Sequence, residues 1–252
     1  MNNDYDFGNN LHTDVRALIP LIAVHGDNLV GAEIGVWKGD AFLTMLHNCP
    51  NIKTLHGVDF YEPYNDYLSP GVYNANEPSV VYDKKDIDFI KLVCYHRLEY
   101  SGHKDKIRFH EMDSNEAAEY IDDDSLDFIF LDAYLTGEQA KNDLEVWLRL
   151  GMKRLKPGGE ISLIMKASSL GTILSTMEEK VGSIKILPIS SFKNVPCSRI
   201  IVTGKLGAKG DTSLLTPLIM HTKKNFEGKK SNFTKLAEGI LYEGDSIDLG
   251  TI

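Results

Sequence analysis

Hydrophobic and polar positions alternate along this chain in blocks that predict strands and helices in turn. Short apolar runs are typical of strands covered on both faces, whereas apolar residues that recur every three or four positions are typical of helices. The runs predict strands at 29–34, 54–59, 107–112, 126–131, 160–165, 184–188 and 198–203. The helical periodicity predicts helices at 13–25, 41–48, 86–98, 116–120, 138–150 and 170–181. This alternation predicts an α/β fold with an open, mostly parallel seven-stranded sheet, helices on both faces and a terminal antiparallel strand.

The patterned region, residues 12–204, lies between two segments of different composition. Residues 1–11 are polar without periodicity and predict a flexible N-terminus, and residues 205–252 form a C-terminal extension rich in Gly, Lys, Thr and Ser. Within the region, residues 61–100 begin with an irregular stretch rich in Tyr, Pro and Asn and continue as a helical pattern. An irregular stretch of this length is often a lid over a binding site. A surface excursion whose tyrosines pack on the domain explains the pattern equally well.

The first predicted strand runs into a glycine turn, Glu33-x-Gly35-x-x-x-Gly39, and a helix follows. Glycine lets the backbone turn tightly and approach a ligand closely, so this strand–turn–helix unit is typical of open sheets that bind nucleotides. The carboxylate inside the turn favours a positively charged ligand group over a pyrophosphate, which prefers bare N–H groups at a helix N-terminus. Taken alone, the motif is also explained by a tight turn that binds no ligand.

Acidic residues stand at the carboxyl ends of four consecutive predicted strands: Glu33, Asp59, Asp113 and Asp132. The carboxyl ends of parallel strands share one rim of the sheet, where ligands bind. Asp59 follows the glycine turn by about twenty positions, the spacing at which a carboxylate accepts hydrogen bonds from ribose hydroxyls. A ligand with an amino group, a ribose diol and an exocyclic amine would pair with several of these carboxylates.

Four segments carry a resemblance to a known family: 30–39, 126–133, 143–147 (Asp-Leu-Glu-Val-Trp) and 155–161 (Leu-Lys-Pro-Gly-Gly-Glu-Ile). In this order and spacing they resemble the class I S-adenosylmethionine-dependent methyltransferases over residues 12–204. Within that superfamily, the chain looks most like the group that contains small-molecule and sugar O-methyltransferases. The resemblance implies a Rossmann-like sheet, S-adenosylmethionine as cofactor and a small-molecule methyl acceptor, such as a sugar-containing compound.

The resemblance also implies roles for individual residues around the cofactor. The residues implied to bind it are Glu33, Gly35, Gly39, Asp59, Phe60, Asp113, Ser114 and Asp132. The two glycines would let the methionine and ribose lie on the turn, and Glu33 would meet the methionine amine. Asp59 would hold the ribose hydroxyls and Phe60 would pack on the adenine. Asp113 would accept from the adenine amino group, with Ser114 nearby.

For catalysis, the resemblance places Asp132 at the methyl-transfer pocket, where it is the best-placed base, and Tyr134 would orient the acceptor. Lys166, His110 and Glu111 are weaker candidates. Many relatives carry a histidine shortly after the aspartate of the fourth strand, whereas this chain reads Asp-Ala-Tyr-Leu-Thr at 132–136. Residues 165–169 read Met-Lys-Ala-Ser-Ser and supply no acidic or amide ligand. A divalent cation needs several oxygen ligands, so no bound metal is expected.

Two other functions remain open from the sequence. A catalytically inactive protein that binds S-adenosylmethionine would explain the missing histidine and metal ligands, since a fold by itself does not imply activity. An NAD-dependent oxidoreductase is a weaker alternative, because the turn lacks the close G-x-G-x-x-G spacing.

Composition limits the partners and the location. The chain has 252 residues and a net charge of −9, so nucleic acid would be repelled over most of the surface. No apolar run approaches the ~18 residues that cross a bilayer, and the polar start is unlike a signal peptide, so a cytoplasmic protein without membrane contact is expected. The three cysteines, at 49, 94 and 197, form neither a disulfide framework nor a zinc motif. The sequence does not indicate an oligomeric state.

Overall fold

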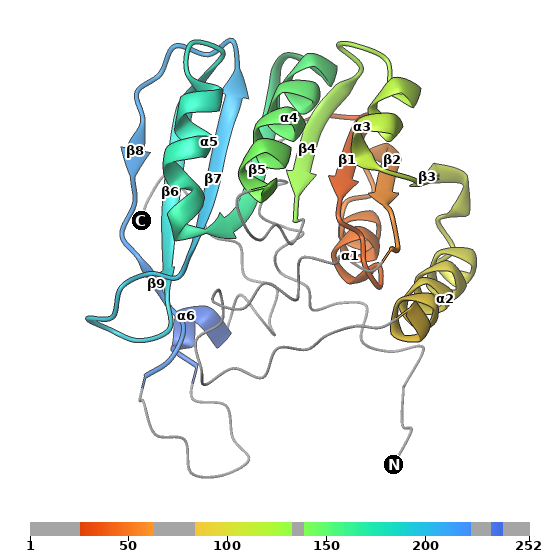
Figure 1. Ribbon diagram of the computed structural model, residues 1–252, viewed down its shortest axis with the longest axis horizontal. Coiled ribbons are helices and arrows are strands. Elements are labelled where there is room, and N and C mark those ends of the chain that lie inside the picture. The colour runs from red at the N-terminus through yellow and green to blue at the C-terminus, as the bar shows by residue number, and fades with distance from the viewer. Residues whose placement is uncertain (1–25, 63–83, 133–138, 223–232, 239–252) are drawn as a thin grey trace.

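Strands in the described part of the chain form one sheet, with helices on both of its faces (Figure 1). The computed structural model describes residues 26–62, 84–132, 139–222 and 233–238, so the helix predicted at 13–25 lies outside them. The strands are β1 (Leu29–Ile34), β2 (Ile52–Asp59), β3 (Ile107–Glu111), β4 (Leu126–Leu131), β5 (Leu155–Lys166), β6 (Val181–Ser190), β7 (Arg199–Leu206), β8 (Ser213–Leu214) and β9 (Leu218–Ile219). The helices are α1 (Asp40–Asn48), α2 (Lys84–Tyr100), α3 (Ser114–Ala117), α4 (Gln139–Arg154), α5 (Leu170–Met177) and α6 (Lys235–Glu238). Short 3₁₀ turns are η4 (Lys104–Lys106), η5 (Ala118–Tyr120) and η6 (Ala167–Ser169).

The order of strands across the sheet is β3-β2-β1-β4-β5-β7-β6-β8, and β9 also pairs with β6. Neighbours from β3 to β5 are parallel, whereas β7 is antiparallel to both β5 and β6. This arrangement confirms the predicted fold class and its terminal antiparallel strand. The predicted count of seven strands is wrong, because the described residues contain nine. The two extra strands, β8 and β9, have only two residues each, which is too short to leave a periodic pattern in the sequence.

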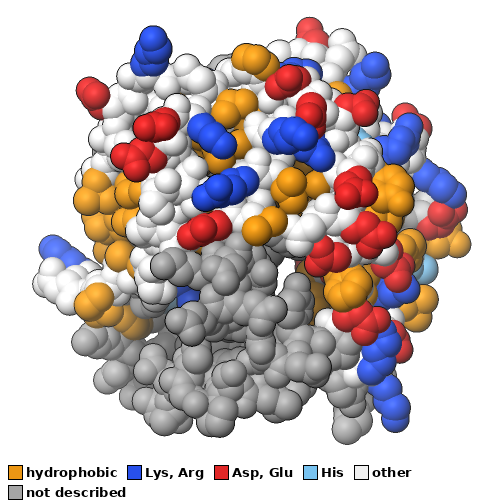
Figure 2. Space-filling view, turned by 45° about the horizontal axis from the view of Figure 1, so that its top comes forward, with side chains coloured by type: hydrophobic (Ala, Val, Ile, Leu, Met, Phe, Trp, Pro, Cys, Tyr) orange, Lys and Arg blue, Asp and Glu red, His pale blue; other side chains and the backbone are white. Residues whose placement is uncertain are grey.

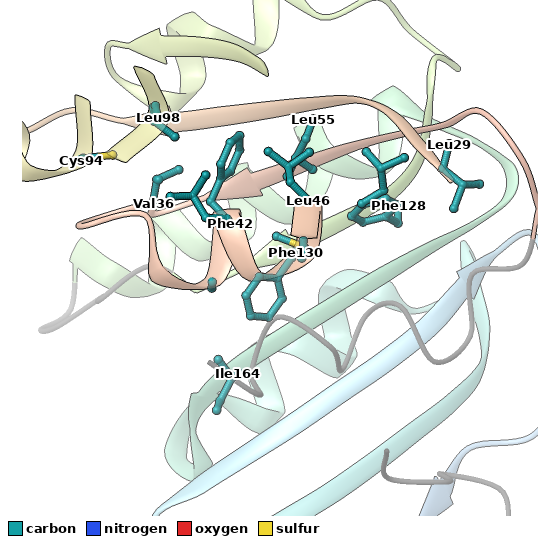
Figure 3. Packing of buried hydrophobic residues seen from close by; sticks show 14 of the residues in the cluster. Leu29, Val36, Phe42, Leu46, Leu55, Cys94, Leu98, Phe128, Phe130 and Ile164 are labelled. Carbon is teal, nitrogen blue, oxygen red and sulfur yellow. The ribbon is translucent and has the colours of Figure 1, made fainter. Parts of the chain in front are cut away.

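Two apolar layers cover the two faces of the sheet. Helices α1 and α2 pack on one face, where Phe42 and Leu46 of α1 meet Phe128 and Phe130 of β4 (Figure 3). Helices α4 and α5 cover the other face. That face is lined by Ile129 and by other strand residues that alternate with those of the first face. Successive side chains of a strand point to opposite faces, so β4 is buried on both sides, as its unbroken apolar run predicts. No helix among the described residues is both long and apolar enough to span a membrane.

Buried polar side chains cross the middle of the sheet where β5, β7 and β6 pair. Glu160 is 3% exposed, and Ser162 and Thr203 are also buried. The register places Glu160 opposite Lys205 and Thr203 opposite Lys185. Ser162 Oγ donates to Glu160 Oε1 at 3.4 Å, while Glu160 Oε2 has no hydrogen-bond partner among the described residues. Burial raises the pKa of Glu160 to about 7, and Lys205 and Ser162 offset this rise only in part.

Replacing Glu160 with glutamine is therefore expected to stabilise the protein above neutral pH. The folded pKa lies above the ordinary value, so ionisation of Glu160 costs stability as the pH rises through about 7, and glutamine avoids that cost. The gain in unfolding free energy should be on the order of 3 kcal/mol at pH 8 and should shrink below about 1 kcal/mol at pH 5. Urea unfolding at both pH values measures it. Glu178→Gln, at an exposed position, serves as the matched control. An equal difference at both pH values would contradict the prediction.

Candidate functional site

The turn between β1 and α1 contains three residues in the left-handed backbone region. Their φ angles are 90° at Gly35, 54° at Trp37 and 84° at Gly39. Glycine adopts this region freely, which explains positions 35 and 39, whereas a tryptophan there is strained. The N–H of Gly35 donates to the carbonyl of Val58 at 2.9 Å, so the turn is tied to the end of β2. The sequence motif therefore forms the predicted strand–turn–helix unit.

Asp59, the last residue of β2, is fixed by two backbone donors. The N–H of Trp37 donates to Asp59 Oδ2 at 2.7 Å, and the N–H of Tyr61 donates to Oδ1 at 3.1 Å. Burial raises the pKa of the Asp59 carboxyl, and these backbone hydrogen bonds partly offset the rise. Besides Trp37 and Tyr61, the backbone N–H groups of Phe60 and Val36 also lower this pKa. The side chain therefore lies beside the glycine turn, and its contact with a ribose stays a prediction.

Tyr61 is a component of this site that sequence reasoning missed. Its hydroxyl donates to the carbonyl of Trp37 at 2.6 Å, its side chain is buried, and its ring lies 6.3 Å from that of Phe109. In the sequence, Tyr61 stands at the start of an irregular tyrosine-rich stretch, which has no periodicity to set it apart. Its position two residues after Asp59 was the available signal, because that spacing brings its backbone N–H to the carboxylate.

The acidic strand ends lie along one rim of the sheet, and the strand order places them as Asp113, Asp59, Glu33 and Asp132. The parallel strands β1, β2 and β4 run in the same direction and end at this rim (Figure 1). Glu33 is only 1% exposed, and the N–H of Asp132 donates to the carbonyl of Ile34 at 3.1 Å, joining the ends of β4 and β1. The structure therefore gathers these residues, and their contacts with a cofactor stay predictions.

The residues predicted to contact adenine lie at the ends of β2 and β3. Phe60 is 47% exposed, so its ring is accessible for stacking. Asp113 is the N-cap of α3, and its Oδ1 accepts from the backbone N–H and the side-chain amide of Asn115, both at 2.9 Å. Both of these bonds use Oδ1, which leaves Oδ2 for a ligand donor. Ser114 Oγ is buried without a hydrogen-bond partner among the described residues.

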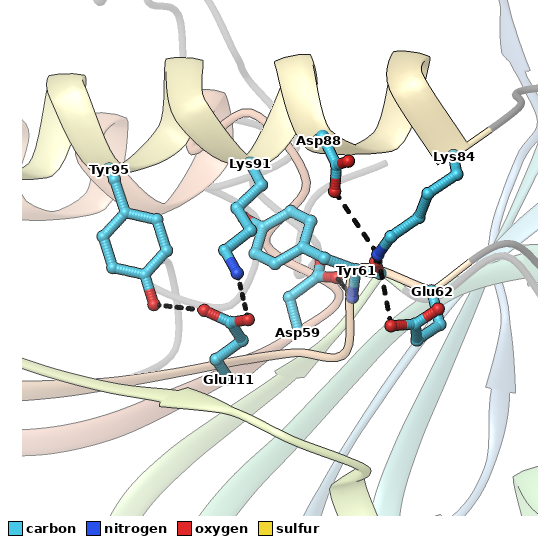
Figure 4. Close-up of polar contacts among 8 residues, drawn as sticks. All are labelled: Asp59, Tyr61, Glu62, Lys84, Asp88, Lys91, Tyr95 and Glu111. Atoms are coloured by element: carbon cyan, nitrogen blue, oxygen red, sulfur yellow. Dashed lines mark hydrogen bonds and ion pairs between the residues drawn. The ribbon is translucent and has the colours of Figure 1, made fainter.

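The candidates for catalysis differ in their surroundings. Asp132 is half-buried at the end of β4 and Lys166 is half-buried at the end of β5, whereas Tyr134 lies outside the described residues. His110 and Glu111 have partners within the fold. The ring nitrogen Nε2 of His110 lies 3.0 Å from Nδ1 of His56. Glu111 pairs with Lys91 and accepts from the hydroxyl of Tyr95 at 2.7 Å (Figure 4).

The stretch at 61–100 contributes a core element. Its helical part is α2, which buries Ile87, Ile90, Cys94 and Leu98 in the same apolar layer as α1. The crossover from β2 to β3 therefore includes α2, and residues 63–83 lie outside the described part of the chain. The described residues contain no group of three His, Cys, Asp or Glu side chains arranged to hold a metal ion.

The sequence matches the family model described as a methyltransferase domain over residues 32–163, just over half of the chain. The matched span contains the glycine turn and all four acidic strand ends. No curated protein matches the sequence.

Several solved structures share the fold. A predicted O-methyltransferase from Agrobacterium tumefaciens has a TM-score of 0.61 and 16% identity, over 89% of this chain and 94% of its own. An S-adenosylmethionine-dependent O-methyltransferase from Thermotoga maritima has a TM-score of 0.52 and 12% identity, over 77% of this chain and 65% of its own. A tRNA (m1A58) methyltransferase from Aquifex aeolicus has a TM-score of 0.51 and 11% identity, over 77% of this chain and 68% of its own. At these identities the similarity shows a common fold, and the named acceptors differ.

Proposed function

The chain belongs to the family of methyltransferase domains and is a class I S-adenosylmethionine-dependent methyltransferase, and from this premise we propose that it methylates a hydroxyl oxygen of a small polar molecule. A sugar-containing compound is the acceptor class that we favour. The observation that carries the cofactor part of the proposal is the Asp59 carboxylate, which two backbone N–H groups hold beside the glycine turn.

The positive charge and the hydrogen-bond donors of the proposed cofactor match the carboxylates at the rim. Asp59 would accept from the two ribose hydroxyls, and Asp113 Oδ2 would accept from the adenine amino group. Glu33 would balance the positive charge of the methionine amine from the end of β1. Gly35 and Gly39 would allow close approach of the cofactor to the turn, because no Cβ stands in its way.

The proposed reaction is an in-line displacement at the methyl carbon of the sulfonium. The acceptor oxygen forms a bond to that carbon, the carbon–sulfur bond breaks, and S-adenosylhomocysteine leaves. Alignment of the oxygen with the methyl group supplies much of the acceleration. Asp132 would take the hydroxyl proton as a base, and Tyr134 would orient the acceptor. We propose that this chemistry needs no metal ion.

The acceptor class follows from charge and from the long crossover. A net charge of −9 disfavours nucleic acid, whose phosphates a basic surface would attract. Lys and Arg side chains are interspersed with Asp and Glu side chains over the described surface in Figure 2. We propose that the region 61–100 shapes the acceptor site, and that α2, which packs in the core, supports the rest of this region.

Isothermal titration with S-adenosylmethionine, S-adenosylhomocysteine and NAD tests the cofactor, and methyl transfer to a panel of sugars, phenols and tRNA tests the acceptor. We expect both sulfur compounds to bind and NAD not to bind, and we expect turnover with a hydroxylated small molecule that persists in EDTA. Binding without turnover on any acceptor would favour the inactive cofactor-binding alternative. Turnover on tRNA alone would overturn the proposed acceptor, and loss of turnover in EDTA would overturn the metal-free chemistry.

A further inference from the structure

Two carbonyl groups of the glycine turn accept hydrogen bonds from side chains that follow β2 in the sequence. The hydroxyl of Tyr61 donates to the carbonyl of Trp37 at 2.6 Å, and Nη1 of Arg97 donates to the next carbonyl, that of Lys38, at 3.1 Å. Arg97 also pairs with Asp40 at 2.6 Å, at the start of α1. Two consecutive peptide groups of the turn are therefore fixed by side chains that come from beyond β2.

Trp37 has a strained backbone conformation that these hydrogen bonds stabilise. Its φ of 54° lies in the left-handed region, which costs a residue with a side chain roughly 1 kcal/mol or more. Its N–H is bound to Asp59 and its carbonyl to Tyr61, so hydrogen bonds fix the peptide groups on both of its sides. The N–H of Tyr61 returns to Asp59 and closes a ring of three residues.

The surroundings of Tyr61 keep its hydroxyl in the form that donates a hydrogen bond. Its side chain is 4% exposed and packs in the layer that contains Cys94 of α2. Figure 4 shows Tyr61 beside Asp59, below α2, with the ion pairs of Lys84 next to it. Lys84 pairs with Glu62 at 3.2 Å and with Asp88 at 3.3 Å, so the backbone that follows Tyr61 is tied to the start of α2. Burial raises the pKa of Tyr61, which keeps its hydroxyl protonated.

We propose that Tyr61 is a positioning residue for cofactor binding. By holding the Trp37 carbonyl, its hydroxyl keeps the Trp37 N–H directed at Asp59, and the oriented carboxylate then accepts the ribose hydroxyls. The inference rests on the proposed cofactor site. Tyr61 acts through Trp37 and Asp59, so it affects how tightly the cofactor binds and leaves the methyl-transfer step itself unchanged.

The test compares Tyr61→Phe with Tyr95→Phe in the full chain. Phenylalanine keeps the ring that packs against Phe109 and removes only the hydroxyl. Tyr95 is a matched control because its hydroxyl also donates a hydrogen bond, to Glu111 at 2.7 Å, from α2. Titration with S-adenosylhomocysteine gives the dissociation constant, kinetics give KM and kcat, and thermal unfolding gives the stability of each sample.

We expect Tyr61→Phe to raise the dissociation constant and the KM for S-adenosylmethionine by about 3- to 10-fold, with kcat within about twofold of the parent. Tyr95→Phe should leave the dissociation constant and the KM for S-adenosylmethionine within about twofold. A lower unfolding temperature with unchanged affinity would assign Tyr61 to the fold alone and overturn the inference. A lower kcat with unchanged KM would also overturn it. If the parent protein does not bind S-adenosylhomocysteine, the proposed function itself fails, and the inference falls with it.

Discussion

Replacing Asp59 with alanine is expected to weaken S-adenosylhomocysteine binding by about 100-fold, which corresponds to roughly 3 kcal/mol. The carboxylate would accept two ribose hydroxyls, and hydrogen bonds to a charged group contribute about 1.5–3 kcal/mol each. Alanine also removes the acceptor of the Trp37 and Tyr61 N–H groups, so the turn loses the contacts that hold it against β2. Isothermal titration measures the effect.

The matched control is Asp127→Ala. Asp127 also accepts a hydrogen bond from a backbone N–H, that of Val30, at 2.8 Å. It lies near the start of β4, however, at the end of the strands opposite the rim. Its Oδ1 also accepts from Nζ of Lys156 at 2.7 Å. This variant should lower stability and leave cofactor affinity unchanged. If Asp59→Ala binds as tightly as the parent, the cofactor site lies elsewhere.

Replacing Gly31 with alanine is expected to destabilise the protein by about 3 kcal/mol, the upper range for an overpacked core. A Cβ at Gly31 would overlap the ring of Phe128, inside the layer between the sheet and α1. The Phe128 side chain is 0% exposed, so its ring cannot move aside without displacing its neighbours. Thermal unfolding should show a midpoint lower by roughly 6–12 °C.

Gly171→Ala provides the contrast. Gly171 lies in α5, and a Cβ added there would meet no atom within 4 Å. Alanine at this position should therefore raise stability by about 0.5–1 kcal/mol through its helix propensity. An unchanged unfolding midpoint for Gly31→Ala would show that the ring of Phe128 has room to move, contrary to the packing described.

The elements of the fold were largely predictable because their signals are local. The strands β1 and β4 have the predicted bounds, since each is an apolar run between polar residues. Predicted ends are less accurate elsewhere. Strand β5 begins at Leu155 instead of 160, because its pairing with β4 shifts register between Leu126 and Phe128 and takes in the glycine-containing turn. Strands β8 and β9 exist only because β6 offers a free edge.

By itself, the sequence determined the glycine turn, the acidic strand ends and the order of strands and helices that carries them to one rim. These features depend on residues close together in the chain and on the general rule that parallel strands end at a shared edge. Only the tertiary structure decided how Asp59 is oriented and that Tyr61 belongs to the site, because Trp37 meets them across sequence separations of 22 and 24 residues. The burial of Glu160 likewise depends on the pairing of β5 with β7. Such contacts leave no periodic signal, since each depends on the packing of segments that are distant in the sequence.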